Sequence, residues 1–344
     1  MSEQRTEISS LGEFGLIDHL TRDNEILQAG TLLSVGDDAA VIDHFGKQTV
    51  ITTDLLLEGV HFDLMYTPLK HLGYKAVAVN LSDIYAMFAT PTHITVSIGI
   101  SNKFSVEALD EFYAGVYAAC EKFNVDLVGG DTSTSVRGFV ISITALGEVV
   151  PEQYVTRAGA KKNDLICVSG TLGAAYTGLQ LLEREKKIFL EHPSVQPDLQ
   201  QKQYIVGRFL KPEPREDIVN WLKEQEIIPT SMIDVSDGLS SELLHICKHS
   251  QTGCLIHEEK LPIHDETREM AFEFKLDPTM CALNGGEDYE LLFTVAPQEY
   301  EKIVLSEQIS VIGYVTDIEE GANLQTRNGN RHGLKAQGWN AFKA

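Results

Sequence analysis

The chain has 344 residues, of which 43% are hydrophobic and 23% charged, and its formal net charge is −22. This size suits a globular protein of about two domains, and the acidic balance argues against nucleic acid or an anionic membrane as a partner. No apolar run approaches the roughly 20 residues of a membrane span, and the N-terminus lacks an apolar signal region. We therefore expect a cytoplasmic protein. Its five cysteines form no CxxC pair, and we expect them to be small core residues.

The N-terminal half alternates β-branched runs with segments of helical spacing. In chain order, the expected elements are two short strands around a turn within 35–57, a helix over 71–88, a strand over 92–100, a helix over 105–123 and a strand over 139–149. Asp54 follows the β-branched run 49–53, where we expect the strand to end. Gly129-Gly130-Asp131-Thr132 is expected as a loop, and a domain boundary falls near Val150-Pro151.

The C-terminal half repeats the mixture of strands and helices. The expected elements are a strand over 164–169, a helix opened by 170–173 that runs through Leu182, a helix holding Trp221, an extended segment over 232–237, a helix over 239–249 and a strand over 289–295. The polar stretch 187–203 contains two prolines and is expected as a surface excursion. Alternating strands and helices indicate an α/β or α+β protein.

Acidic residues recur in surroundings of small or apolar residues, where a solvated charge is not expected. The motifs are Gly36-Asp37-Asp38, Thr52-Thr53-Asp54, Asn80-Leu81-Ser82-Asp83, Gly129-Gly130-Asp131-Thr132, Asp234-Val235-Ser236-Asp237-Gly238 and Gly285-Gly286-Glu287-Asp288. A buried carboxylate is costly unless it is paired, hydrogen-bonded or bound to a cation. Several carboxylates with neighbouring hydroxyls suit Mg²⁺ bound together with phosphates, which indicates nucleotide chemistry.

Each motif taken alone has a structural alternative. The Asp37-Asp38 pair is also typical of a turn, Thr53-Asp54 of a helix cap, and the Gly-Gly-Asp sequence of a simple turn. Residues 170–173 precede a helix and could form an anion site at its N-terminus or a tight strand–helix packing contact. Arg157 could clamp a phosphate or form a surface ion pair, and a lone His61 is compatible with a structural role.

Taken together, in this order and spacing, the motifs resemble the thiamine-monophosphate kinase family. That family belongs to the superfamily of aminoimidazole-ribonucleotide synthetase and selenophosphate synthetase. Besides the acidic motifs, Thr156-Arg157-Ala158-Gly159-Ala160 matches, and the resemblance extends from Gly12 to Phe342. It implies ATP-dependent phosphorylation of thiamine monophosphate to thiamine diphosphate by direct in-line transfer, in thiamine diphosphate biosynthesis.

The resemblance also implies a two-domain α/β fold. Residues 1–150 would bind ATP and Mg²⁺ and pair their sheet with a second copy, giving the barrel of a homodimer, and residues 151–344 would complete the active-site cleft. The implied ligands of several Mg²⁺ ions are Asp38, Thr52, Thr53, Asp54, Asp83, Asp131, Asp234 and Asp237. The implied ATP contacts are Tyr113, Gly130, Asp131, Arg157 and Ser236, and the implied thiamine monophosphate contacts are His61, Glu287 and Trp339.

A few positions depart from the family pattern, and other functions stay open. Phe88 stands where the family usually has Gly, and 188–203 has no strong match. A selenophosphate synthetase would need a reactive Cys in the N-terminal glycine-rich region, and a hydrogenase-maturation protein a C-terminal Cys; this sequence has neither. An aminoimidazole-ribonucleotide synthetase and a non-catalytic nucleotide-binding protein remain as alternatives.

Overall fold

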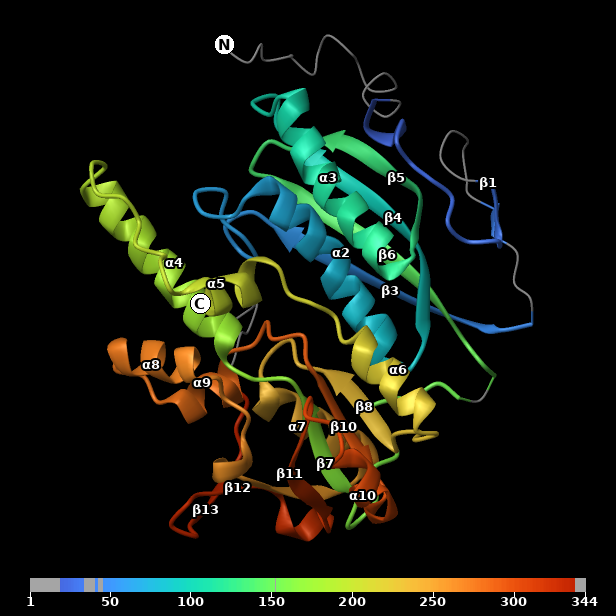
Figure 1. The fold of residues 1–344 in the computed structure, drawn as a ribbon, viewed down its shortest axis with the longest axis vertical. Coiled ribbons are helices and arrows are strands. Elements are labelled where there is room, and N and C mark those ends of the chain that lie inside the picture. Colours follow the sequence, from blue (N-terminus) through green and yellow to red (C-terminus); the bar gives the residue numbers. More distant parts are fainter. Residues whose placement is uncertain (1–18, 34–40, 43–45, 152, 338–344) are drawn as a thin grey trace. The chain divides into compact units, whose positions relative to one another are not determined.

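The computed structural model describes residues 19–33, 41–42, 46–151 and 153–337 (Figure 1). The chain divides into two compact units, Met1–Ile84 with Ala89–Glu152 and Tyr85–Phe88 with Gln153–Ala344. Both combine helices with β-sheet, which confirms the expected α/β class. No helix within the described ranges is both long enough and apolar enough to span a bilayer.

The first unit is built on a four-stranded sheet in the order β3-β6-β4-β5. Its strands are β3 (Gln48–Leu57), β4 (Thr90–Ile100), β5 (Asp126–Thr134) and β6 (Val140–Val149). β6 is antiparallel to β3 and β4, whereas β4 and β5 are parallel. A parallel pair needs a crossover connection, and helix α3 (Val106–Phe123) supplies it. Strands β1 (Thr31–Leu33) and β2 (Val41–Ile42) form a separate antiparallel pair.

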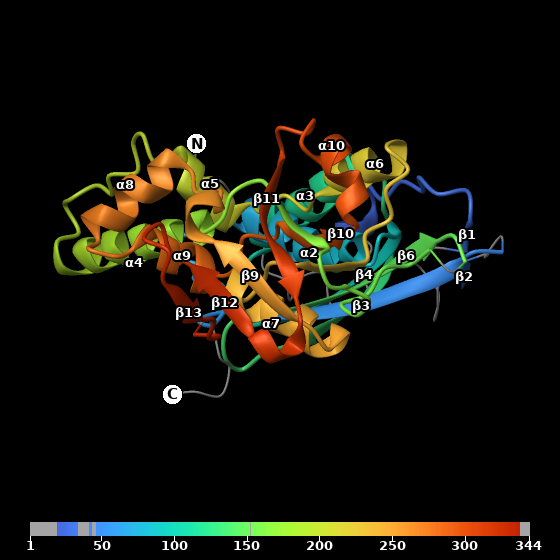
Figure 2. The same cartoon turned by 90° about the horizontal axis from the view of Figure 1, so that it is seen from below.

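Helices α2 (Leu69–Ala86) and α3 lie together on one face of this sheet (Figure 2). Their backbones approach closely: a Cβ on Gly73 would lie 1.9 Å from the Phe112 carbonyl oxygen, and one on Gly115 would lie 1.9 Å from that of Lys70. Glycine is therefore required at both positions. Ser105 caps α3 as expected, because its hydroxyl accepts the Ala108 N–H at 3.3 Å.

The two strands expected within 35–57 correspond to β2 and β3, which pair with β1 and β6 respectively. Two other expectations for the first unit are wrong. β3 continues to Leu57, which places Asp54 inside the strand rather than at its end. Gly129–Thr132 is not a loop, because the parallel ladder with β4 extends β5 through all four residues.

Helix α2 ends in a Schellman-type turn that contains Phe88. The Phe88 N–H donates to the Tyr85 carbonyl at 2.9 Å, and the Ala89 N–H donates to the Ile84 carbonyl at 3.2 Å. Phe88 has a left-handed φ of 60°, a conformation that glycine adopts far more readily than other residues. Its ring is buried in the second unit, where the Lys223 ammonium lies 5.3 Å from the ring centroid.

The second unit contains a seven-stranded sheet in the order β13-β12-β9-β11-β7-β10-β8. Its strands are β7 (Leu165–Ser169), β8 (Ser231–Asp234), β9 (Gly253–His257), β10 (Leu291–Val295), β11 (Ile309–Thr316), β12 (Ala322–Gln325) and β13 (Arg331–Gly333). Only the β9–β12 pairing is parallel among the described strands of this sheet. The expected strands over 164–169 and 289–295 correspond to β7 and β10.

The second unit also contains helices. They are α4 (Ala174–Glu191), α5 (Gln203–Leu210), α6 (Glu216–Glu224), α7 (Leu239–Ser250), α8 (Asp265–Glu273), α9 (Pro278–Asn284) and α10 (Tyr300–Ile303). Leu239, Leu243 and Ile246 of α7 pack into the main hydrophobic core against strand residues. α4 runs nine residues past its expected end at Leu182, because Leu, Glu, Arg and Lys favour helix over this stretch.

Candidate active site

In the first unit, β3 and α2 bring together a hydroxyl and two carboxylates. The Thr52 hydroxyl donates to Asp83 Oδ2 at 2.6 Å. Burial, and secondarily the charge of Asp83, raise the pKa of Asp54 to about 6. The charge of Asp83 therefore disfavours ionisation of Asp54. A cation beside the two carboxylates would favour their ionised form, so Thr52, Asp54 and Asp83 fit the oxygen-donor set expected from the sequence.

Asn80 orients the strand that carries Asp54. This side chain is fully buried on α2, one helical turn before Asp83. Its Oδ1 accepts the Asp54 backbone N–H at 2.9 Å, and its Nδ2 donates to the Ala76 carbonyl at 2.9 Å. Asn80 thus fixes the strand to the helix through both its carbonyl oxygen and its NH₂ group.

The side chain of Thr53 lies on the opposite face of β3 from Thr52 and Asp54, because side chains alternate along a strand. It is exposed, and its hydroxyl donates to the Ile143 carbonyl at 3.0 Å and accepts from the Thr144 hydroxyl at 3.2 Å. The structure therefore does not bring this hydroxyl to the Asp54–Asp83 pair.

Gly130 and Asp131 lie in β5, in register with Val96 and Ser97 of β4. The two strands approach so closely at Gly130 that a Cβ would lie 1.8 Å from the Val96 carbonyl oxygen. Asp131 follows with an exposed side chain. A backbone without a side chain next to an exposed carboxylate is accessible to an anionic ligand and its counter-ion.

The two remaining sequence-predicted residues of the first unit have well-defined neighbours. Tyr113 of α3 is 7% exposed and packs edge-to-face on Phe112, with a ring-centroid distance of 5.5 Å. His61 is half-buried in a turn after β3, and its Nδ1 accepts the Leu57 N–H at 2.9 Å. Because Nδ1 is an acceptor, the neutral His61 ring carries its proton on Nε2.

In the second unit, the end of β8 and the start of α7 carry the other acidic motif. Asp234 is the last residue of β8 and is 4% exposed. Burial raises the pKa of Asp237, with Glu287 adding to the rise while His245 and Arg157 oppose it. Glu287 and Arg157 therefore each lie within electrostatic range of Asp237. Arg157 itself is exposed, as a phosphate clamp requires.

Sequence reasoning missed Glu242, which supports this motif from the first turn of α7. Its side chain is 3% exposed, and Oε1 accepts the Asp237 N–H at 2.9 Å. Burial raises the pKa of Glu242 to about 7, against the lowering effect of that hydrogen bond. The only sequence signal was an acidic residue in a first helical turn, which is a common and unspecific feature.

The Gly285–Glu290 loop lies beside the same motif. The Glu287 N–H donates to the Ser236 carbonyl at 2.6 Å, and a Cβ on Gly286 would lie 2.6 Å from that oxygen. Glu287 itself is half-buried. Glycine at 286 therefore permits the close approach that joins Glu287 to Ser236.

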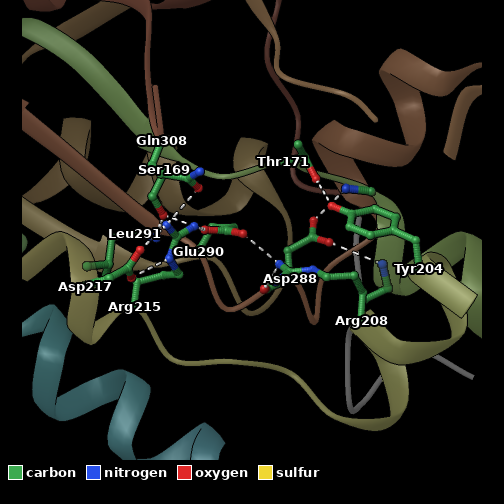
Figure 3. Close-up of polar contacts among 12 residues, drawn as sticks. Ser169, Thr171, Tyr204, Arg208, Arg215, Asp217, Asp288, Glu290, Leu291 and Gln308 are labelled. Carbon is green, nitrogen blue, oxygen red and sulfur yellow. Dashed lines mark hydrogen bonds and ion pairs between the residues drawn. The ribbon is translucent and has the colours of Figure 1, made fainter. Parts of the chain in front are cut away.

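The N-terminus of α4 is occupied by a carboxylate of the chain itself (Figure 3). Asp288 is fully buried, and its Oδ2 accepts the Gly173 N–H at 2.7 Å while Oδ1 accepts the Ala175 N–H at 3.3 Å. The sequence left open whether residues 170–173 form an anion site or a tight strand–helix contact. Because Asp288 already accepts the N–H groups at this helix start, an anion site for a ligand is not supported.

Two predicted residues, Asp38 and Trp339, lie outside the described residues. Among those described, no group of three or more His, Cys, Asp or Glu side chains is arranged to hold a metal ion. The carboxylates form instead a pair on β3 and α2, an exposed residue on β5, and the β8–α7 motif. In either unit, a metal would therefore take part of its ligands from the hydroxyls or phosphates of a substrate.

Comparison with known proteins identifies the family. Residues 36–149 match the AIR synthase related protein, N-terminal domain. The chain is 36% identical to thiamine-monophosphate kinase of Buchnera aphidicola subsp. Schizaphis graminum, over 96% of this chain and 98% of that protein. It is 33% identical to thiamine-monophosphate kinase of Bacillus subtilis, over 97% of this chain and 100% of that protein.

Solved structures show the same relationship. Thiamine-monophosphate kinase from Stenotrophomonas maltophilia is 32% identical with a TM-score of 0.77, covering 93% of this chain and 98% of that one. AaThiL, solved in complex with AMPPCP and TMP, is 32% identical with a TM-score of 0.74, covering 99% of this chain and 100% of that one. The hydrogenase maturation protein HypE, at 21% identity and a TM-score of 0.73, shares the fold. The chain therefore belongs to the thiamine-monophosphate kinase family.

Proposed function

We propose that the protein transfers the γ-phosphate of ATP to thiamine monophosphate, giving thiamine diphosphate, as a cytoplasmic step of thiamine diphosphate biosynthesis. The observation that carries the proposal is the Asp54–Asp83 pair, held on β3 and α2 in a chain that matches this family over its length. Such a pair suits a reaction in which metal ions bring two polyanions together. It also explains how a chain of net charge −22 can accept anionic substrates.

Magnesium is part of the proposal. Its proposed ligands are Asp38, Thr52, Asp54, Asp83, Asp131, Asp234 and Asp237. The hydroxyl of Thr53, which the sequence also suggested, is left out because it lies on the opposite face of β3. The raised pKa of Asp54 beside Asp83 supports this choice for the first unit, because a nearby cation would favour the ionised form of both. When bound at these residues, Mg²⁺ would supply Lewis-acid stabilisation of the phosphate charge. Thr52 would orient Asp83 through its 2.6 Å hydrogen bond.

The remaining proposed residues bind the organic parts and the phosphates of the substrates. Tyr113, Gly130, Asp131, Arg157 and Ser236 are proposed for ATP, and His61, Glu287 and Trp339 for thiamine monophosphate. Arg157 would neutralise phosphate charge without ever losing its own proton. An aromatic ring such as that of Trp339 is a favourable partner for the cationic thiazolium.

The acceptor is a phosphate oxygen that is ionised near neutral pH, so the chain does not need to supply a general base. Its residues act by binding, orienting and balancing charge, which is the main requirement of phosphoryl transfer. We propose direct in-line transfer without a phosphorylated enzyme. Incubation with γ-labelled ATP alone should leave the denatured protein unlabelled, and a stable covalent label would contradict direct transfer.

An ATP-dependent assay tests the reaction. Purified protein with Mg²⁺ is given thiamine monophosphate, free thiamine or no acceptor, and thiamine diphosphate and ADP are both measured. We expect thiamine diphosphate only from the monophosphate, in equal amount to ADP. ATP binding without transfer to any thiamine species would overturn the proposal and favour a binding protein of the same fold.

Asp131 provides a residue-level test, because its side chain is exposed and we expect its removal to leave the sheet intact. We expect Asp131→Ala to lose at least about tenfold in kcat/KM with an unchanged melting temperature, because a positioned carboxylate ligand is lost. Glu121→Ala removes an equally exposed carboxylate from α3 and should keep full activity. Activity of Asp131→Ala close to that of the control would remove Asp131 from the ligand set.

We also propose that the first unit pairs with a second copy through its sheet. Helices cover one face, whereas the other exposes the side chains of Ile51, at 64%, and Leu55, at 52%, on β3. Exposed apolar residues in line on an edge strand favour association. Sedimentation should show a dimer that Ile51→Lys with Leu55→Lys converts to a folded monomer. A monomeric wild type at micromolar concentration would contradict the pairing.

A further inference from the structure

Two residues in the Gly285–Glu290 loop adopt left-handed backbone conformations without being glycine. Glu287 has a φ of 58° and Tyr289 a φ of 50°. Each such residue is strained and persists only where the surrounding structure enforces it. Because Glu287 is the residue proposed to contact thiamine monophosphate, the groups that enforce its conformation also determine where its carboxylate lies.

Asp288, between these two residues, anchors the loop to α4. It is fully buried, and its carboxylate accepts the N–H groups of Gly173 and Ala175 at 2.7 and 3.3 Å. These N–H groups belong to the first turn of an 18-residue helix, whose dipole favours negative charge there. The side chain of Asp288 therefore turns into the protein, and Glu287, one residue earlier, is only half-buried.

Arg208 joins this anchor to a second buried carboxylate (Figure 3). Its Nη2 donates to the Asp288 carbonyl at 2.6 Å and to Glu290 Oε1 at 2.8 Å. Glu290 Oε2 accepts from Arg215 Nη1 and from the Ser169 hydroxyl, each at 2.5 Å. A buried ionic network of this kind contributes little net stability but strongly disfavours any other arrangement of its members.

The loop is also joined by its backbone to the acidic motif after β8. The Glu287 N–H donates to the Ser236 carbonyl at 2.6 Å, and the Tyr289 N–H donates to the Val235 carbonyl at 2.9 Å. Both donors belong to the left-handed residues that flank Asp288. Release of Asp288 from α4 would let these two residues leave the left-handed region and would lengthen both hydrogen bonds.

We propose that Asp288 is a positioning residue, which holds Glu287 in its left-handed conformation by capping α4 and does not itself touch a substrate. This inference rests on the proposed function for the role of Glu287. The two adjacent acidic residues would then have different roles. Glu287 would contact the ligand, and Asp288 would hold Glu287 in place.

Hydrogen exchange tests the positioning without any activity. In Asp288→Ala, the amides of Glu287 and Tyr289 should exchange about tenfold faster or more than in wild type, since local opening becomes easier. Asp288→Asn keeps an acceptor for the Gly173 N–H, so its exchange rates should lie between those of wild type and Asp288→Ala. Ser105→Ala removes a comparable cap from α3 in the first unit and should leave both amides unchanged. Unchanged exchange in Asp288→Ala and Asp288→Asn would overturn the proposal.

A double-mutant cycle tests the consequence for the substrate. We expect Asp288→Ala to raise KM for thiamine monophosphate about tenfold in wild type, but to have little further effect when Glu287 is already Ala. A purely stabilising role would lower the melting temperature and leave KM unchanged in both backgrounds. Equal, additive effects on KM with Glu287 present or absent would contradict action through Glu287.

The two measurements also separate this inference from the proposed function. Faster exchange in Asp288→Ala together with an inactive wild type would overturn the kinase reaction while leaving the positioning role of Asp288. Normal kinase activity of the wild type with unaltered amide exchange in Asp288→Ala would support the kinase reaction and overturn the positioning role of Asp288. If Asp288→Ala fails to fold, Asp288→Asn and Arg208→Lys provide the same comparison with smaller changes to the buried network.

Discussion

Gly130→Ala is the sharpest test of how β5 presents Asp131. The added Cβ would lie 1.8 Å from the carbonyl oxygen and 2.7 Å from the carbonyl carbon of Val96. Ordinary contact between carbon atoms begins at about 3.5 Å, so β4 and β5 would have to separate locally by roughly 1 Å. Overpacking of this kind costs about 1–3 kcal/mol of unfolding free energy. At 2 kcal/mol the melting temperature would fall by roughly 4–8 °C.

The neighbouring Gly129 provides a matched control, because a Cβ there would have nothing within 4 Å and its φ is not left-handed. We expect Gly129→Ala to be neutral or to gain up to about 1 kcal/mol by restricting the unfolded chain. Calorimetry and urea denaturation measure both variants, and activity is measured at a temperature where each is folded. Two variants with equal stabilities would refute the close approach of β5 to Val96, as would a Gly130→Ala protein that melts within about 1 °C of wild type.

Three other outcomes are expected. Phe88→Gly removes a strained φ but also a buried ring. Urea denaturation should therefore show a net loss of about 1–2 kcal/mol in the free energy of unfolding. A gain in that free energy would mean that the strain outweighs the burial of the ring. In Asp83→Asn, NMR titration should place the pKa of Asp54 below its value of about 6 yet above 3.8, because burial remains; no change would exclude coupling. Burial raises the pKa of Asp288 from 3.8 to about 7 on folding, so its contribution to stability is present below pH 4 and lost as pH rises through 7. The stability of Asp288→Asn relative to wild type should therefore improve between pH 4 and 8, and a constant difference would contradict this shift.

Local patterns in the sequence predicted the elements that have strong local signals. The α3 cap at Ser105, the β-branched run in β3 and the helix after Gly238 all arise from short-range preferences, and the structure has them. The Gly129–Thr132 stretch was expected as a loop because glycine and aspartate favour turns. It is a strand because β4, thirty residues earlier, offers a parallel partner that the sequence pattern does not reveal.

The candidate site shows the same division. The acidic motifs were visible because carboxylates beside small residues are unusual, and the family pattern supplied their number and order. Glu242 and Asn80 were not assigned roles, since their importance depends on the Asp237 and Asp54 amides that the fold brings to them. Asp288 was grouped with Glu287 on sequence alone, although one side chain turns into the protein and the other does not.

The pairing of β3 has a consequence for the order in which the first unit forms. Its ladder runs from Gln48 opposite Val149 to Leu57 opposite Val140, so each contact closes a loop of about 80 to 100 residues. During synthesis at roughly 5–20 residues per second, the strand that carries Asp54 waits some 5–20 seconds for its partner. A ribosome-bound fragment that ends before β6 would therefore contain both carboxylates of the Asp54–Asp83 pair without the strand that aligns β3.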